Sequence, residues 1–421
     1  MATRALDVWL YERRAGRLEA RHGALTYAYE PAWVDERMPP LSQSLPVRGE
    51  PFTGEPVHAF FANLLPEGDV RRHVARRFGV SVGNDFELLA AIGGDCAGAV
   101  SLTARDGRPR PDERGRVRWL DDAELADVVA DLPRRPLMAD PDEGIRLSLA
   151  GAQDKLPVVV AGGRVGVPTG GAPSTHILKV PIAGLDDTVV NEAFCLRLAR
   201  SLRLEAAAAE VLRVGDQDVL LVERYDRDRS ADTVRRLHQE DFCQALAVPP
   251  EAKYEAEGGP GAAQSVELLR RASAQPARDV LRFADALVFN LLVGNHDAHG
   301  KNYSVLYRPE GTALAPLYDL VSTAAYRHLS RRLAMAVGGE YRGDWVRARH
   351  VDRFAERAQL GPAALRRRAA RLAAVLPDAA RDTVEELRGE GLHRPVLDRI
   401  VEVVARRAGP LQAGLATPRP G

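Results

Sequence analysis

Residues 281–302, LRFADALVFNLLVGNHDAHGKN, join a long apolar run to a dense polar one. The first half is apolar on most sides of a helical wheel, which predicts a buried helix. Gly294 takes the place of a glycine that ends a helix at its carboxyl terminus. The polar residues 295–302 would then form a loop carried by a rigid helix. Enzymes hold reactive groups in this way, so we interpret the loop as a candidate active site.

The loop has the residue spacing of phosphoryl-transfer enzymes. Asp297 and Asn302 are separated as in the D-x-x-x-x-N pattern of a kinase catalytic loop. There the carboxylate orients or deprotonates the attacking hydroxyl, and the amide oxygen holds a metal ion. Asp319 is the candidate for a carboxylate on the same metal. Residues 303–307 alternate like a strand and residues 308–311 are typical of a turn. We expect the resulting hairpin to bring Asn302 and Asp319 together.

Lysine is rare in this chain and marks candidate phosphate contacts. Only four of the 58 basic residues are lysines, at positions 155, 179, 253 and 301. A compact ammonium that contacts a phosphate is not freely replaced by a guanidinium. Lys179 lies in the apolar segment 175–180, where a lone charge would be costly. We predict that it binds nucleotide phosphates and pairs with Glu192 on the following helix. The alternative is a strand-edge lysine that reaches to water.

A second phosphate-binding segment is predicted at residues 148–155, SLAGAQDK. Small residues before Lys155 would let the backbone approach phosphates closely. Ser148 would place a hydroxyl near the nucleotide. The segment is not a Walker A motif, because G-x-x-x-x-G-K-[ST] is absent. The alternative is a tight turn into the strand predicted at residues 158–160.

Two further segments have candidate roles. Residues 218–222 form an apolar strand that leads into Glu223 and Tyr225, where a kinase hinge would contact adenine through backbone groups. Residues 238–244, HQEDFCQ, are predicted to begin a helix whose first turn carries acidic residues, which suits the helix dipole.

The composition argues against several other classes of protein. The 421 residues contain 58 basic and 58 acidic side chains, so no overall charge indicates a nucleic-acid or membrane partner. No run of about 18 apolar residues could span a bilayer, and the amino terminus lacks a signal-peptide pattern. Three cysteines without zinc-site spacing suggest a reducing compartment. We therefore expect a cytoplasmic protein.

The rest of the chain predicts an α+β protein in three parts. Residues 1–105 form a small α+β subdomain, residues 106–228 a lobe with the phosphate-binding loop and the nucleotide lysine, and residues 229–421 a mostly helical lobe with the catalytic loop and metal site. A charged, Gly- and Pro-containing stretch at 105–118 is expected to be a linker or exposed hairpin. Amphipathic spacing predicts helices at 347–357, 363–376 and 397–407, with a frayed end from residue 411.

The motifs, taken in order, resemble those of the HipA family, which are bacterial serine/threonine kinases that act as toxins in type II toxin–antitoxin modules. The matching stretches are SLAGAQDK (148–155), HILK (176–179), ERYDR (223–227), QEDFCQ (239–244), DAHGKN (297–302) and YDLVS (318–322). The resemblance covers nearly the whole chain. It implies a two-lobed protein-kinase-like fold with an additional amino-terminal subdomain, and ATP with Mg²⁺ as its ligands.

The resemblance also implies roles for individual residues. Asp297 would be the catalytic base, Asn302 and Asp319 the metal ligands, and Ser148 a site of autophosphorylation that switches the kinase off. A phosphate there would add about two negative charges beside the nucleotide phosphates, which would repel the loop. The implied ATP-binding set is Lys179, Ala150, Gly151, Ala152, Gln153, Lys155, Glu223, Tyr225, His299 and Lys301, and the supporting set is Glu192, Gln239 and Asp241.

The implied partners are a small helix-turn-helix antitoxin, operator DNA bound through it, and a protein substrate in translation, typically an aminoacyl-tRNA synthetase. Other interpretations stay open on the residues alone. One is a kinase-fold corepressor that has lost its chemistry, and another is a small-molecule kinase. A last one takes His296 and His299 as metal ligands, although no third ligand is evident and orientation of the loop is the simpler role.

Overall fold

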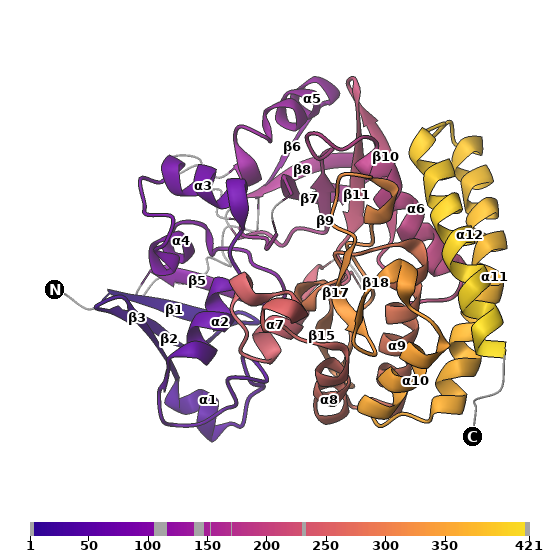
Figure 1. Cartoon of the computed structure of the whole chain (residues 1–421). Coiled ribbons are helices and arrows are strands. Elements are labelled where there is room, and N and C mark those ends of the chain that lie inside the picture. Colours follow the sequence, from indigo (N-terminus) through magenta and orange to yellow (C-terminus); the bar gives the residue numbers. More distant parts are fainter. Residues whose placement is uncertain are drawn as a thin grey trace. The chain divides into compact units, whose positions relative to one another are not determined.

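The structure is a computed structural model that describes residues 4–104, 116–138, 147–151, 153–169, 171–229 and 233–416 (Figure 1). The chain forms two compact units and passes between them several times. The first contains Met1–Val180, Leu212–Glu251 and Leu306–Pro309, and the second contains Pro181–Val211, Ala252–Val305 and Glu310–Gly421. Both contain helices and strands, which confirms the predicted α+β class. The predicted three-part division of the chain stays a prediction, and its linker falls largely in 105–115, outside the described residues.

The first unit begins with an antiparallel sheet in the order β4-β3-β2-β1-β5. Its strands are β1 (Arg4–Leu10), β2 (Arg13–Arg21), β3 (Ala24–Tyr29), β4 (Phe52–Thr53) and β5 (Val100–Ala104). Its helices are α1 (Pro31–Asp35), α2 (Glu55–Ala62), α3 (Gly68–Arg77) and α4 (Asp85–Ile92). Large aromatic side chains such as Trp33, Phe60 and Phe61 fill the core. The four arginines of β2 interrupt its apolar alternation.

A second sheet of the first unit has the order β10-β11-β9-β7-β8-β6 and a separate apolar core. Its strands are β6 (Arg116–Trp119), β7 (Lys155–Ala161), β8 (Arg164–Thr169), β9 (His176–Lys179), β10 (Ala209–Val214) and β11 (Gln217–Glu223), accompanied by α5 (Asp122–Asp131) and η1 (Pro136–Met138). The predicted strands at 158–160, 175–180 and 218–222 are confirmed. Lys155 begins β7, so it belongs to a strand and not to the loop before it.

The segment 238–244 corrects a prediction. Residues His238–Asp241 form strand β14, and only then does the short helix α7 (Phe242–Ala245) begin. Asp241 is the N-cap of α7, and its carboxylate accepts a hydrogen bond from the Gln244 backbone NH at 2.8 Å. The acidic residues therefore precede the helix. Two short strands, β12 (Arg227–Asp228) and β13 (Arg235–Arg236), lie just before this segment in the chain.

The second unit is mostly helical. Its helices are α6 (Thr188–Ser201), α8 (Ala262–Ala272), α9 (Pro276–Val293), α10 (Ala348–Arg357), α11 (Pro362–Gly389) and α12 (Pro395–Ala416). The long helices α11 and α12 pack along each other and against α6 and α9 (Figure 1). The three helices predicted after residue 347 are confirmed, but the frayed end is not. Helix α12 continues to Ala416, because Leu411 and Leu415 are buried.

Two hairpins complete the second unit. The strand β15 (Ser304–Arg308), whose last residues belong to the first unit, pairs with β16 (Gly311–Leu314), and β17 (Arg332–Val337) pairs with β18 (Glu340–Arg342). Four short 3-10 turns lie beside them, namely η3 (Glu255–Glu257), η4 (Gly300–Asn302), η5 (Thr323–Ala325) and η6 (Gly343–Trp345). In the described part of the chain, no helix is both long enough and apolar enough to cross a bilayer.

Candidate active site

Helix α9 ends where the polar loop begins. Gly294 adopts a left-handed conformation, with φ of 79°, at the carboxyl end of the helix. Its carbonyl accepts hydrogen bonds from the Ala324 backbone NH at 2.9 Å and from the Thr323 hydroxyl at 3.1 Å. The loop is thus anchored to the segment that follows Asp319, and the buried helix with its glycine cap is confirmed.

Asp297 is an exposed residue at the centre of this loop. Its backbone NH donates to Asn295 Oδ1 at 3.1 Å, which fixes the turn locally. The Tyr254 hydroxyl donates to Asp297 Oδ1 at 2.7 Å, and the edge of the Tyr254 ring meets the His299 ring with centroids 5.2 Å apart. Sequence reasoning missed Tyr254. Its only signal was a Lys-Tyr pair in a loop rich in proline and glycine.

Asn302 and Asp319 lie together, as the predicted hairpin required. The Asn302 side-chain NH2 donates to Asp319 Oδ2 at 2.9 Å. The amide oxygen of Asn302 is buried and has no hydrogen-bond partner among the described residues. Asp319 has φ of 56°, a left-handed conformation that a non-glycine residue adopts at a cost. Both features are typical of side chains held for a ligand and not for the fold.

This pair fits a magnesium ion. Mg²⁺ prefers oxygen ligands, and protein sites hold it through one or two carboxylates while phosphates and water complete the shell. The buried Asn302 oxygen and the neighbouring Asp319 carboxylate offer that donor set. Within the described ranges no group of three His, Cys, Asp or Glu side chains is placed to hold a metal, so a zinc-type site has no support there.

His296 of the loop is engaged by the protein at both ring nitrogens, which does not suit a metal ligand. His296 Nδ1 lies 3.0 Å from the Ser330 carbonyl oxygen, and its Nε2 lies 2.8 Å from Arg407 Nη2. Both ring nitrogens are thus engaged by the protein. Burial, together with the Arg407 charge, lowers the pKa of His296 to about 4, so the ring is neutral at physiological pH. Its role is to support the loop.

The first unit contains a separate group of candidate phosphate contacts. In the β7–β9 ladder Lys155 and Lys179 are direct cross-strand partners. Like charges placed opposite each other destabilise a sheet, unless an anion lies between them. The Lys155 ammonium donates to the Ala150 carbonyl, and Gly151 before it has φ of 104°. That left-handed backbone conformation favours glycine at position 151.

In the loop before β7, the Ser148 side chain points into the protein. That side chain is fully buried, and its hydroxyl donates to the Leu64 carbonyl at 2.7 Å. Its backbone NH donates to the Asp95 carbonyl at 3.0 Å. The Gln153 amide donates to the Val180 carbonyl at 3.0 Å. Ala152 lies outside the described residues. In this conformation Ser148 cannot receive a phosphoryl group, because its hydroxyl is buried against backbone.

The hinge candidates follow β11 and are held by a buried ionic cluster. Arg224 and Asp226 form an ion pair of 2.7 Å on either side of Tyr225, and Arg227 and Asp95 join it. Burial would raise the pKa of Asp226, but the Arg224 and Arg227 charges hold it well below the usual range. The Tyr225 hydroxyl donates to Gln239 Oε1. Glu223 is partly exposed and meets Arg229 at 3.2 Å.

The structure therefore forms two groups of predicted site residues, one in each unit. The second unit contains Asp297, His299, Lys301, Asn302, Asp319 and Glu192, and the first contains Ser148, Ala150, Gly151, Gln153, Lys155, Lys179, Glu223, Tyr225, Gln239 and Asp241. Lys179 and Glu192 belong to different units, so their predicted pairing stays a prediction. The same holds for a single cleft that includes Lys179, Asn302 and Asp319.

Comparisons with known proteins agree with these observations. The model of the HipA N-terminal domain matches residues 6–103, and that of the HipA-like C-terminal domain matches residues 147–384. "Putative kinase Y4mE" of Sinorhizobium fredii is 45% identical over 97% of this chain and 98% of its own length. The serine/threonine-protein kinase toxin HipA of Shewanella oneidensis is 32% identical over 91% of this chain and 90% of its own.

A solved structure extends the likeness to the fold. A chain from the complex of Shewanella oneidensis HipA, HipB and operator DNA matches with a TM-score of 0.82 and 29% identity, over 97% of this chain and 96% of that one. Two family models in the expected order, relatives matched over nearly their full length, and a matching solved fold all name the same group. The chain belongs to the HipA family of serine/threonine-protein kinase toxins.

Proposed function

We propose that this protein is an ATP-dependent serine/threonine protein kinase that arrests growth as the toxin of a type II toxin–antitoxin module. The observation that carries the proposal is the Asn302–Asp319 pair with its buried, unused amide oxygen, on the same unit as the exposed Asp297. A corepressor that had lost its chemistry would have no reason to retain a strained aspartate beside an unused oxygen.

In this proposal each polar group has a defined task. Asp297 accepts the hydrogen bond of the attacking hydroxyl and takes its proton as the phosphoryl group is transferred. Asn302 and Asp319 hold Mg²⁺, which when bound neutralises charge on the nucleotide phosphates. Lys155 and Lys179 supply two ammonium groups to those phosphates.

The remaining ATP contacts are proposed on family likeness together with position. They are Ala150, Gly151, Ala152 and Gln153 of the phosphate loop, Glu223 and Tyr225 of the hinge, and His299 and Lys301 of the catalytic loop. Glu192, Gln239 and Asp241 support them. The closed loop over Ser148 is consistent with autophosphorylation as an off-switch, because a dianionic phosphate could not remain against the Leu64 carbonyl.

The proposed partners follow the solved relative, which was crystallised with HipB and operator DNA. We propose a small helix-turn-helix antitoxin that binds this chain and brings it to DNA. The protein substrate is proposed to belong to translation, with an aminoacyl-tRNA synthetase as the first candidate.

The test is transfer of labelled phosphate from ATP and Mg²⁺ to the protein itself and to lysate proteins. Asp297→Asn should lower the rate at least 100-fold, which corresponds to about 3 kcal/mol, because it removes the proton acceptor. Asp378→Asn is the matched control, since this carboxylate on α11 is 76% exposed and paired with Arg381. Wild-type protein that labels nothing would contradict the kinase assignment.

Phosphopeptide mapping of the same samples tests the serine. Ser148→Ala should remove the main self-labelled peptide while lysate substrates remain labelled, because the serine accepts phosphate but takes no part in transfer. An unchanged phosphopeptide pattern would show that another residue is modified.

A further inference from the structure

An unusual run of arginine follows Asp319 in the chain. Residues 327–353 contain seven arginines and only three acidic residues, in a protein whose basic and acidic residues are equal in number. Each acidic residue already has an arginine: Glu340 pairs with Arg342, Asp344 with Arg407 and Asp352 with Arg366. Six exposed arginines are left without a carboxylate among the described residues, at positions 327, 331, 332, 347, 349 and 353.

The β17–β18 hairpin lies at the centre of this run. Arg332 and Arg342 are direct cross-strand partners, although two like charges in that position destabilise a hairpin. Each guanidinium lies over an aromatic ring, Arg332 at 4.5 Å from the Tyr341 centroid and Arg342 at 3.6 Å from that of Trp345. Trp345 is 57% exposed. Arg342 is also held by Glu340, whereas the exposed Arg332 meets no carboxylate among the described residues, so its guanidinium is available to a ligand.

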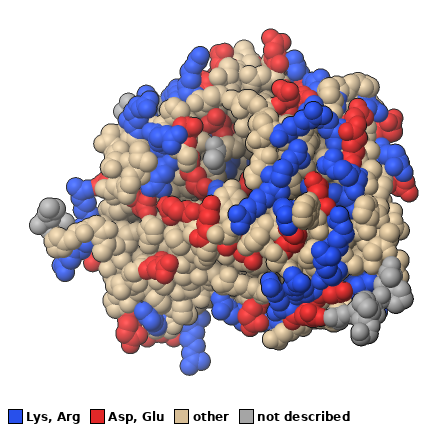
Figure 2. All heavy atoms as spheres, in the orientation of Figure 1, with Lys and Arg blue, Asp and Glu red and all other residues tan. Residues whose placement is uncertain are grey.

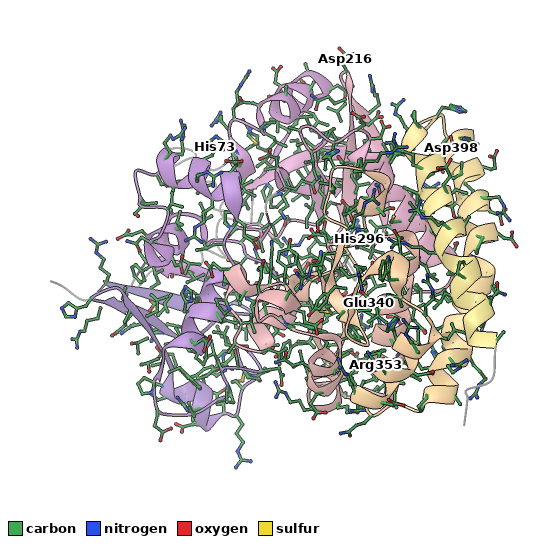
Figure 3. The ribbon with its side chains drawn as sticks, viewed as in Figure 1. His73, Asp216, His296, Glu340, Arg353 and Asp398 are labelled. Atoms are coloured by element: carbon green, nitrogen blue, oxygen red, sulfur yellow. The ribbon has the colours of Figure 1, made fainter. Side chains whose placement is uncertain are left out.

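The hairpin also lies directly beside the catalytic loop. The Ala334 backbone NH of β17 donates to the His296 carbonyl at 2.8 Å, one residue before Asp297. On the far side, Arg353 of α10 reaches the Gly338 carbonyl of the hairpin turn at 3.4 Å. Figure 3 labels His296, Glu340 and Arg353, which mark these three elements, and Figure 2 shows basic side chains gathered over the same part of the molecule. The basic surface thus begins within a few residues of the proposed base.

We propose that this surface, made by Arg327, Arg331, Arg332, Arg349 and Trp345, docks an acidic segment of the protein substrate next to its phosphorylated serine or threonine. The proposal rests on the proposed kinase function. Guanidinium groups bind carboxylates through paired hydrogen bonds, and their stacking on aromatic rings holds them ready to do so. A nucleic acid would also meet a basic surface, but a substrate peptide must pass beside Asp297, where this surface lies.

The experiment compares two synthetic peptides with the full-length protein, ATP and Mg²⁺. Both contain one serine, flanked in one by Asp and Glu and in the other by Asn and Gln. The acidic peptide should have a kcat/KM at least tenfold higher, and the advantage should shrink between 50 and 300 mM salt. Arg332→Gln with Arg349→Gln should remove most of that advantage.

Arg381→Gln with Arg388→Gln is the matched control, because these two arginines lie on α11, outside the basic run, and are 58% and 33% exposed. It should keep the full preference. If that double variant fails to fold, as judged by thermal unfolding, Arg327→Gln with Arg331→Gln replaces it.

Binding of a fluorescein-labelled acidic peptide, measured by anisotropy, provides a readout independent of turnover. Tight binding of the acidic peptide without phosphorylation would support the docking proposal and contradict the proposed kinase function. Phosphorylation of both peptides at equal rates would contradict the docking proposal but would support the proposed kinase function. The docking proposal would equally fail if single-stranded RNA bound the hairpin arginines more tightly than the acidic peptide did.

Discussion

At the scale of single residues, spacing along the chain identified the groups whose chemistry is local. Asp297 and Asn302 share one loop, and a short hairpin leads on to Asp319, so their proximity could be predicted. Tyr254 could not be found in this way, because it lies 43 residues before the aspartate it contacts and no pattern joins them. The left-handed backbone of Asp319 was likewise invisible, since nothing in the residue type demands it.

The Tyr254 hydroxyl is predicted to position and stabilise the Asp297 carboxylate. A hydrogen bond to a charged group contributes about 1.5–3 kcal/mol when shielded and less at an exposed site. Tyr254→Phe should therefore lower kcat about tenfold and move the acid limb of the kcat/KM profile to higher pH by about half a unit to one unit. Initial rates of peptide phosphorylation between pH 5 and 9 measure both effects.

Two results would count against this role of Tyr254. A faster variant would mean that the hydroxyl competes with the substrate for Asp297, and an unmoved acid limb with a lower kcat would mean that the ring only packs against His299. Tyr11→Phe is the control, because it removes a partly buried tyrosine hydroxyl from the first unit, whereas Tyr254 and Asp297 belong to the second.

At the scale of elements, apolar periodicity predicted the helices and strands that bury apolar side chains. It gave α9, β9 and the β15–β16 hairpin, but not β2, whose four arginines interrupt the pattern. Arg13, Arg14 and Arg17 form ion pairs instead, as Arg17 does with Asp7 at 3.3 Å. The sequence predicts the start of a helix where the structure has strand β14. The two inward-facing residues of that strand, His238 and Glu240, are titratable, so the strand shows no apolar alternation. Polar side chains that are buried with hydrogen-bond partners do not add to an apolar pattern, so the sequence does not show that they are buried.

The junction between α9 and the catalytic loop gives an element-scale prediction. A Cβ on Gly294 would lie 2.5 Å from Ala324 Cβ and 2.8 Å from Val403 Cγ1, in a left-handed conformation. Gly294→Ala should destabilise the protein by about 2–4 kcal/mol, from backbone strain and overpacking together. Thermal unfolding would show this as a fall of several degrees, accompanied by loss of kinase activity.

Gly389→Ala is the control for that change. Gly389 is the exposed last residue of α11, with nothing within 4 Å of its Cβ position, so alanine should leave stability unchanged or raise it by up to about 1 kcal/mol. A Gly294→Ala protein as stable as the wild type would mean that Ala324 and Val403 move aside, and the proposed rigid anchoring of the loop would be wrong.

At the scale of the whole molecule, the contacts that tie distant stretches together were beyond sequence reasoning. In the first unit the buried carboxylate of Asp95 meets Arg224, Arg227 and Arg236, more than 120 residues away. Burial alone would raise the pKa of Asp95, but these three arginines lower it. Isolated acidic and basic residues on a chain give no sign of which will be buried as partners, because the pairing is a property of the completed fold.

A second such contact gives a prediction for the pH dependence of stability. Glu240 is buried where three distant stretches meet: Tyr307 donates to its Oε1 at 2.6 Å, the Gln43 backbone NH donates at 2.9 Å, and the Ser42 hydroxyl donates to Oε2. Burial raises the pKa of Glu240 to about 7, although these donors oppose the shift. An unfolded glutamate titrates near 4.3. Between these two values the folded chain binds more protons than the unfolded one.

Wild-type stability should therefore contain a component that is fully present below about pH 4.5 and is lost as pH rises to about 7. Glu240→Gln lacks the ionisable group. Its amide oxygen can still accept from Tyr307 and Gln43, and its NH2 can donate to the Ser42 hydroxyl. Its free energy of unfolding relative to wild type should rise across this window by up to about 3 kcal/mol and level off above pH 7. Neighbouring His238, whose pKa burial lowers to about 4, has the opposite pH dependence but is present in both proteins and cancels in the difference.

Urea unfolding at half-unit steps from pH 4 to 8.5 measures this difference curve, with Glu50→Gln, an exposed carboxylate of the same unit, as the control. A difference that stays flat from pH 4.5 to 7 for Glu240→Gln would show that the carboxyl is ionised in the folded protein throughout. The three donors would then stabilise a buried charge, and the meeting point of residues 42–43, 240 and 307 would depend on that charge for its structure.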